Sequence, residues 1–223
     1  MSLVTLNNVP VLRLDFMQSS YGPWTADVQL DASVAPAVGS QVSLAIVNTA
    51  RVGTVVRAGA PYQQPRVRVF GGAGKLSTVL PSAKDYGQVT LSAVMRDILT
   101  AVGEKPGNLS ALQNNIVQRY QTAAERASFA LQRVFKLAPG LDLWCERDGT
   151  FSARKMPFTT SEGALVRGVL PQESSIVLFG DTGSIEPGMV VSTLYSDFKV
   201  ERVQYTLEPN DSRSQLTVQV WYQ

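Results

Sequence analysis

The chain has 223 residues, enough to bury a sizeable core in one large domain or in two to three small ones. Lysine and arginine together number 20 and aspartate and glutamate 18, so the formal charge of +2 gives no electrostatic case for binding nucleic acid or an anionic membrane. Charged residues make up only 17% of the chain, which is low for a highly soluble monomer that must repel its neighbours. The low charge content therefore indicates buried interfaces with other subunits.

The first segment, residues 1–82, has the pattern of an antiparallel sandwich or barrel. Its short strands alternate apolar and polar residues or form brief apolar runs, and turn residues such as Asn7-Asn8 and Gly71-Gly72 separate them. Five stretches share this pattern: 4–16, 26–30, 42–46, 52–56 and 67–70. No helical pattern interrupts them.

The second segment, residues 83–158, changes to a helical period. Apolar residues between Leu91 and Val102 recur with the spacing of one helix face, Thr90 is a suitable N-cap, and Gly103 is placed for the left-handed residue that ends a helix. A weaker helical stretch is predicted through Leu109, Leu112 and Ile116. The segment therefore reads as a small α+β unit.

One helix followed by one tight hairpin is predicted over residues 122–155. Thr122 and Glu125 have the spacing of a capping box, so we expect the helix to begin there, and Pro139-Gly140 ends it. Alternating apolar residues then predict a hairpin, with Asp148-Gly149 supplying a type I′ turn. The predicted buried face of the helix comprises Ala127, Ala130, Leu131, Val134, Phe135 and Ala138.

The third segment, residues 159–223, returns to strands. Five are predicted, at 164–170, 175–179, 189–194, 198–207 and 215–221. In the last of them Leu216, Val218 and Val220 alternate with polar residues, so one face is expected to be buried. No apolar run approaches the ∼18 residues of a membrane span.

The chain contains no histidine, which removes the Ser-His-Asp triad, the Cys-His dyad and most zinc sites. Asp181-Thr182-Gly183-Ser184 resembles the active-site loop of aspartic proteases, in which two aspartates share a proton, and a homodimer would supply the second aspartate. However, Gly180 separates Asp181 from the apolar strand before it, and the four residues are ordinary turn composition. We therefore expect no catalytic residue, no cofactor and no metal ligand.

Two further motifs are better explained by structure than by chemistry. Gly71-Gly72-Ala73-Gly74-Lys75 is reminiscent of a phosphate-binding loop, but Val69 stands where the first glycine is required and Leu76 where a serine or threonine is required, so a flexible linker or hairpin tip is favoured. Glu146 and Asp148 are a carboxylate pair of the kind glycosidases use. On a hairpin tip they are expected to be solvated turn residues.

The single cysteine and the three tryptophans complete the candidates. Cys145 has no partner for a disulfide, and its place in an alternating strand indicates a small buried hydrophobe rather than a reactive thiol. Trp24, Trp144 and Trp221 would suit a sugar or base platform, but each lies in or beside a strand, so packing in a core or interface is expected.

The order of these features resembles the baseplate hub proteins of phage tails and related contractile injection systems. In that family a "Glu, aromatic, Leu-x-Arg" helix runs into a strand and an Asp-Gly hairpin. Features in chain order carry the resemblance: Val9-Pro10-Val11-Leu12, residues 22–31, Gly87-Gln88-Val89-Thr90-Leu91, Arg119-Tyr120, the helix with Glu125, Phe129, Leu131 and Arg133, and Trp144 ahead of Asp148-Gly149.

The resemblance implies a mainly β fold with an α+β insert: tail-tube-like antiparallel β-barrels over 1–82 and 159–223 and a small helix-hairpin domain over 83–158. It further implies a non-enzymatic virion protein, assembled in the host cytoplasm, that forms a trimeric ring joining the tail tube and tape-measure protein to the central spike. DNA would pass through the lumen of the ring at ejection.

Two other interpretations stay open at this point. One is a hydrolase, either protease-like through Asp181 or another viral maturation enzyme, and an Asp181→Asn substitution would separate it from a hub. The other is a carbohydrate-binding β-sandwich that uses the three tryptophans, which loss of glycan binding in a single Trp→Ala variant would reveal.

Overall fold

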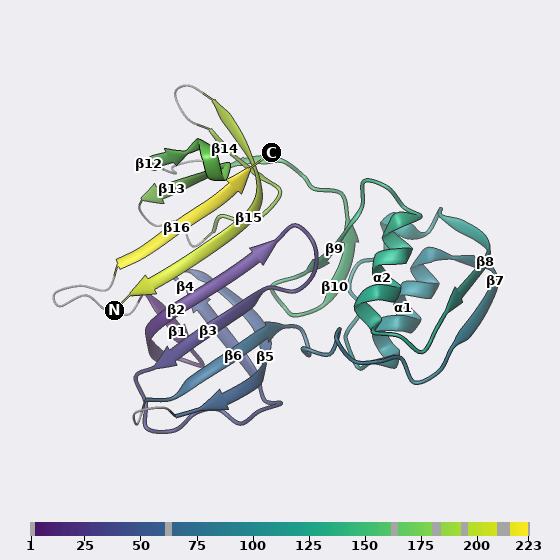
Figure 1. Cartoon of the computed structure of the whole chain (residues 1–223), viewed down its shortest axis with the longest axis horizontal. Coiled ribbons are helices and arrows are strands. Elements are labelled where there is room, and N and C mark those ends of the chain that lie inside the picture. The colour runs from purple at the N-terminus through teal and green to yellow at the C-terminus, as the bar shows by residue number, and fades with distance from the viewer. Residues whose placement is uncertain are drawn as a thin grey trace.

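A computed structural model describes residues 3–60, 64–161, 165–179, 184–192, 196–208 and 215–222. The N-terminal segment forms a closed six-stranded antiparallel barrel (Figure 1). Its strands follow the order β1-β4-β5-β6-β3-β2, and the ring closes where β1 pairs with β2. The strands are β1 (Val4–Leu6), β2 (Val9–Ser19), β3 (Thr25–Leu30), β4 (Gln41–Ile46), β5 (Thr49–Gly59) and β6 (Arg66–Gly71).

The C-terminal strands extend the sheet of this barrel through β2. The start of β2 pairs with β1 at Val9 and Pro10, and the rest of the same edge, from Leu14 to Ser19, pairs with β15. The sheet continues through β16 and β13 to β12. The strands of this extension are β12 (Leu165–Leu170), β13 (Ser175–Phe179), β15 (Asp197–Glu208) and β16 (Gln215–Tyr222).

Three short elements complete the C-terminal part. A 3₁₀ turn, η3 (Pro171–Glu173), joins β12 to β13. Strand β14 (Met189–Ser192) pairs with β15 and, in parallel, with β11 (Thr159–Ser161). The described residues thus hold one closed barrel and an extension of its sheet, which confirms the predicted mainly β fold.

The middle segment forms a separate helical unit to one side of the barrel (Figure 1). It contains two antiparallel strands, two helices and one 3₁₀ turn: β7 (Lys84–Thr90), α1 (Leu91–Ala101), η2 (Ser110–Leu112), β8 (Ile116–Thr122) and α2 (Ala127–Lys136). The Thr90 hydroxyl accepts a hydrogen bond from the Ala93 N–H at 3.3 Å, and Gly103 has a φ of 79°. Both predicted ends of α1 are therefore confirmed.

The helix predicted through Leu109, Leu112 and Ile116 is wrong beyond its first turn. Only η2 is helical, and Ile116 begins strand β8, where its side chain is exposed. The pairing of β8 with β7 supplies hydrogen bonds that a short, weakly periodic helix would have to make alone.

The predicted capping box of α2 is also wrong, because distant partners occupy both of its side chains. Thr122 ends β8, and its hydroxyl accepts a hydrogen bond from the Lys84 N–H at 3.1 Å. Glu125 forms a two-pronged ion pair with Arg133. This pair joins the glutamate and the arginine of the motif on which the resemblance rests, and it holds the chain before α2 against the body of that helix.

Helix α2 begins at Ala127 because another part of the backbone caps it. The N–H groups of Ala127 and Ser128 donate to the carbonyls of Thr78 and Leu76 at 3.0 and 2.9 Å. These bonds satisfy two of the donors that every helix leaves open at its N-terminus. The predicted apolar face of α2 is buried, as expected.

A hairpin of β9 (Asp142–Cys145) and β10 (Phe151–Arg154) follows α2 as predicted, but its turn type differs from the prediction. The Gly149 N–H donates to the Glu146 carbonyl, and the Glu146 N–H donates to the Thr150 carbonyl. Gly149 has a φ of 82° whereas Asp148 does not lie in the left-handed region. The turn is therefore of type I, followed by a left-handed glycine, and not type I′.

This hairpin connects the barrel to the helical unit (Figure 1). On the barrel side, the Gly22 N–H donates to the Leu143 carbonyl and the Val52 N–H to the Arg147 carbonyl, both at 2.7 Å. On the other side, the Phe151 N–H donates to the Lys105 carbonyl at 2.8 Å. One apolar core runs through the barrel, the hairpin and the helices. The hairpin therefore fixes the position of the helical unit.

Candidate functional site

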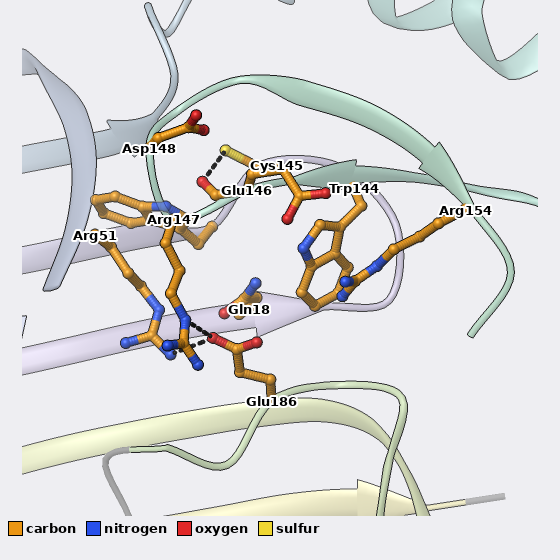
Figure 2. Close-up of a pocket in the computed structure, with 10 residues that line it drawn as sticks. Gln18, Arg51, Trp144, Cys145, Glu146, Arg147, Asp148, Arg154 and Glu186 are labelled. Carbon is orange, nitrogen blue, oxygen red and sulfur yellow. Dashed lines mark hydrogen bonds and ion pairs between the residues drawn. The ribbon is translucent and has the colours of Figure 1, made fainter. Parts of the chain in front are cut away.

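A cavity lies where the barrel, the turn of the β9–β10 hairpin and the segment before β14 meet. Its volume is about 490 Å³. Three arginines line it, together with Trp24, Trp144 and three carboxylates (Figure 2). We call it the arginine pocket and define it by Arg51, Arg147, Arg154 and Glu186.

Arg51 is the deepest cation of the arginine pocket. Alternate residues of β5 face inward, and Arg51 shares this inward face with Thr49 and Val55, so only 1% of its side chain is exposed. Its Nη2 donates to the Glu186 Oε1 at 3.1 Å, and its guanidinium lies 5.1 Å from the Phe16 ring centroid. Burial lowers the pKa of the Arg51 guanidinium from its usual value, and the Glu186 carboxylate opposes that change.

Glu186 joins three parts of the chain in this pocket. Its Oε1 accepts hydrogen bonds from Arg51, on the barrel, and from the Arg147 Nε, on the hairpin turn, at 2.9 Å (Figure 2). The segment that carries Glu186 is anchored by the Tyr205 hydroxyl, which donates to the Ile185 carbonyl at 2.7 Å. The ion cluster therefore ties the C-terminal strands to both the barrel and the hairpin.

Arg154 and the two tryptophans form the other wall of the pocket. The Arg154 guanidinium lies 3.7 Å from the Trp144 ring centroid, a stacked cation–π contact (Figure 2). Burial lowers the pKa of Arg154 as well. Trp24 and Trp144 are buried, which confirms the prediction that they pack in a core, whereas Trp221 is partly exposed beside Arg202. The three tryptophans do not form a common platform.

The glycine-rich loop before β7 does bind an anion, but the anion is the protein's own. The backbone N–H groups of Ala73 and Lys75 donate to the two carboxylate oxygens of Glu104 at 2.8 and 2.6 Å. Gly72 and Gly74, with φ values of 75° and 70°, turn these N–H groups to one side. The expectation of a flexible linker or hairpin tip is therefore wrong: the loop is a clamp on Glu104. Burial raises the pKa of Glu104, and the two hydrogen bonds oppose this change.

The remaining predicted residues have structural surroundings. The Asp148 carboxylate accepts hydrogen bonds from the Thr150 N–H and hydroxyl at 2.9 and 2.8 Å, which lowers its pKa, as befits a turn residue. Asp148 and Glu146 both line the arginine pocket. Cys145 is buried as predicted, and burial raises the pKa of its thiol. Asp181, Thr182 and Gly183 lie outside the described residues.

A polar sheet face runs across five strands of the barrel and its extension. It comprises Arg68, Asp27, Asp15, Gln204 and Gln219, on neighbouring strands β6, β3, β2, β15 and β16. Arg68 donates to Asp27 at 2.8 Å through its Nε, and the Gln204 Nε2 donates to the Asp15 Oδ1 at 2.8 Å. These partners keep the face hydrophilic.

Sequence analysis missed Arg51, Glu186 and Glu104 as site residues. The alternation of β5 could have indicated a buried Arg51, because Arg51 lies on the same face of that strand as Val55. For Glu104 and Glu186 no local signal existed, since their partners are 29 and 135 positions away. Over the described part of the chain, no group of three or more metal-ligating side chains gathers, and no helix is long and apolar enough to cross a membrane.

Comparison with known proteins places this fold. No protein-family model matches the chain, and no curated protein matches it by sequence. Among solved structures, the 43 kDa tail protein of prophage MuSo2 from Shewanella oneidensis superimposes with a TM-score of 0.73 at 12% identity, over 98% of this chain and 96% of that one. The fold is that of a phage tail protein.

Two further solved structures share this fold. The tail protein from Neisseria meningitidis MC58 matches with a TM-score of 0.62 at 12% identity, over 98% of this chain and 95% of that one. The E. coli c3393 protein matches with a TM-score of 0.68 at 12% identity, over 99% of this chain and 76% of its own. That protein is a component of the type VI secretion system, with structural similarity to the T4 bacteriophage tail proteins gp27 and gp5. The resemblance found in the sequence is thus confirmed at the level of the tail-protein fold.

Proposed function

We propose that this chain is a structural protein of a phage tail, and specifically a baseplate hub. The observation that carries the proposal is the match over nearly the whole chain to two tail proteins of similar length and to a component of the type VI secretion system. The match includes the barrel, the sheet extension and the helical unit, so it rests on the complete arrangement and not on the barrel alone.

In this proposal the chain forms a trimeric ring. The sheet extension supports it, because β12 ends the sheet among the described strands and Val169 and Leu170, on this strand, are exposed. An edge strand with apolar side chains invites pairing with another chain, and a ring of subunits removes such edges. We assign β12 to the contact between neighbouring subunits.

The ring joins the tail tube and the tape-measure protein to the central spike, and DNA passes through its lumen at ejection. We assign the lumen to the polar sheet face, in which Arg68 is paired with Asp27 and Gln204 with Asp15. Arginines whose charge is matched locally hold phosphates weakly, and DNA must slide through without the multiple phosphate contacts that would retain it. The role is mechanical and non-enzymatic, in the virion tail, and assembly takes place in the host cytoplasm.

The molar mass of the purified protein in solution tests the proposal first. Light scattering across a concentration series, followed by imaging of any oligomer, is expected to give three subunits in a ring with a central channel. A two-fold dimer would contradict the ring and would make Asp181→Asn the next experiment, because a protease-like enzyme loses its activity in that variant and a hub does not change. A monomer that also fails to bind purified tail-tube protein would contradict the hub.

A further inference from the structure

Arg51 is a buried cation whose hydrogen bonding is incomplete. Only its Nη2 has an acceptor, the Glu186 Oε1, whereas Nε and Nη1 are buried without a partner among the described residues. Taking an ion out of water is costly unless hydrogen bonds replace those of the solvent. An acceptor beside Nε and Nη1 would therefore stabilise the folded protein.

Other unpartnered donors line the same cavity. The Trp24 Nε1 and the Arg154 Nε are both buried with no hydrogen-bond partner in the described part of the chain. Together with Arg51 they supply four N–H donor atoms around a cavity of about 490 Å³. Among the fully buried side-chain atoms of the described lining residues, the Gln18 Oε1 is the one acceptor without a partner. Among these buried atoms donors outnumber acceptors, so an acceptor would satisfy them.

The charges of the pocket indicate which kind of acceptor fits. Three arginines face three carboxylates. Asp148 is bonded to its own turn through Thr150, and Glu186 binds two of the arginines. Glu146 acts on Arg154 through its charge, without a hydrogen bond to it. A carboxylate adds one negative charge to this balance, whereas a phosphate adds nearly two. The planar guanidinium of arginine also matches the two oxygens of a carboxylate.

We propose that the arginine pocket binds a carboxylate group. The group belongs either to a small free acid or to an acidic side chain of another polypeptide, which share the same chemistry. Arg51 and Arg154 donate to it from the buried walls, and Arg147 holds it at the entrance. Glu186 is its competitor, because the Glu186 carboxylate occupies donors on Arg51 and Arg147. The proposal does not depend on ring formation.

Titration of the full chain with sodium acetate tests the proposal, with ionic strength held constant by sodium chloride. Tryptophan emission is a suitable signal, since Trp24 and Trp144 line the pocket and Trp221 does not. We expect a saturable change in emission and a rise in the melting temperature. An absence of saturation up to about 100 mM acetate, roughly a hundred times the 1 mM dissociation constant of a weak complex, would overturn the proposal. A stronger response to sodium phosphate would also overturn it.

Two variants are expected to change the affinity for acetate in opposite directions, and a third serves as a control. Arg147→Gln removes one donor, and the Glu186 carboxylate then binds Arg51 alone, so acetate should bind at least tenfold more weakly. Glu186→Gln removes the competing carboxylate, so acetate should bind more tightly. Arg68→Gln is the matched control, because its exposure of 49% is close to the 54% of Arg147 and its partner Asp27 lies elsewhere. Equal affinity in all three variants would overturn the proposal, and simple loss of folding cannot produce both signs.

A capped tripeptide distinguishes the two sources of the carboxylate. Acetyl-Gly-Glu-Gly-amide is compared with acetyl-Gly-Gln-Gly-amide in the same titration. Binding of the glutamate peptide alone assigns the pocket to an acidic side chain of a partner, and binding of acetate with neither peptide assigns it to a free acid. Equal binding of both peptides would overturn the assignment to a carboxylate.

Discussion

The carboxylate of Glu104 accepts a hydrogen bond from the backbone N–H of Lys75 at 2.6 Å, although α1 and β7 separate the two residues in sequence. Lys75 lies just after the barrel and Glu104 just after α1. The bond therefore ties the exit of the barrel to the far end of the first helix, and it makes the glycine-rich loop part of the framework.

The substitution Glu104→Gln is expected to destabilise the protein. The amide keeps one oxygen but places an NH₂ group against a backbone N–H that needs an acceptor, and such an unsatisfied buried donor costs about 1–3 kcal/mol. Chemical denaturation at pH 7 measures the loss. Glu208→Gln serves as control, since Glu208 is an exposed glutamate with one distant arginine partner, and a similar loss in both variants would contradict the clamp.

The contribution of Glu104 to stability is expected to increase as the pH falls. Burial raises the pKa of Glu104 in the folded state above its usual value of 4.5, so the folded protein binds this proton more tightly than the unfolded chain. Stability from this group is fully present below pH 4.5 and is lost as the pH rises through the folded-state pKa. The difference in unfolding free energy between wild type and Glu104→Gln should therefore grow from pH 7 to pH 4, and a flat difference would refute this cause.

Gly72→Ala is expected to cost more than Gly39→Ala, although both glycines have positive φ. A Cβ at Gly72 would lie 2.6 Å from the Phe151 ring and 2.7 Å from the Glu104 carboxylate, whereas nothing lies within 4 Å at Gly39. The left-handed backbone alone costs about 1–2 kcal/mol. Thermal unfolding of both variants should show this loss for Gly39→Ala and a larger one for Gly72→Ala; equal losses would mean that the loop yields without breaking the clamp.

Val169→Lys is expected to reduce the molar mass of any oligomer toward that of one chain. A lysine on an edge strand must be desolvated when another strand pairs with it, which is how natural proteins protect such edges. Light scattering at matched concentrations is the measurement. Val34→Lys replaces a valine that is 75% exposed between β3 and β4, and it should leave the mass unchanged. An unchanged mass in both variants would remove β12 from the interface.

Cys145 is expected to be unreactive in the folded protein. Its side chain is buried and burial raises the pKa of the thiol, so little thiolate forms at pH 8 and a reagent has no access. A colorimetric disulfide reagent should react with one thiol per chain in denaturant and with almost none in buffer. Rapid reaction in buffer would show that the hairpin opens.

Local patterns predicted the elements whose stabilising contacts are local. Helix α1 has its cap residue Thr90 and its terminating Gly103 within its own sequence, and the alternation of the strands fixed which side chains are buried. The hairpin at residues 141–155 was found for the same reason. Its turn was assigned wrongly because Asp-Gly occurs both in type I′ turns and at the end of a type I turn with a left-handed glycine.

Non-local contacts account for what the sequence did not reveal. The side chains of Thr122 and Glu125 have the spacing of a capping box. In the folded chain, however, Thr122 is bonded to Lys84 and Glu125 to Arg133. The arginine pocket gathers Arg51, Arg147 and Glu186 from three parts of the chain. No window of neighbouring residues contains such a site, and only the closure of the barrel and the docking of the hairpin bring it together.

The division of the β2 edge between β1 and β15 has a consequence for synthesis on the ribosome. All six barrel strands have emerged once residue 71 is outside the exit tunnel, and they can close early. Residues 14–19 of β2 then wait for β15, which begins at Asp197, so a bare strand edge persists while most of the remaining chain is translated. A nascent chain stalled in this interval exposes that edge to other nascent chains, and the speed of translation therefore bears on the yield of folded protein.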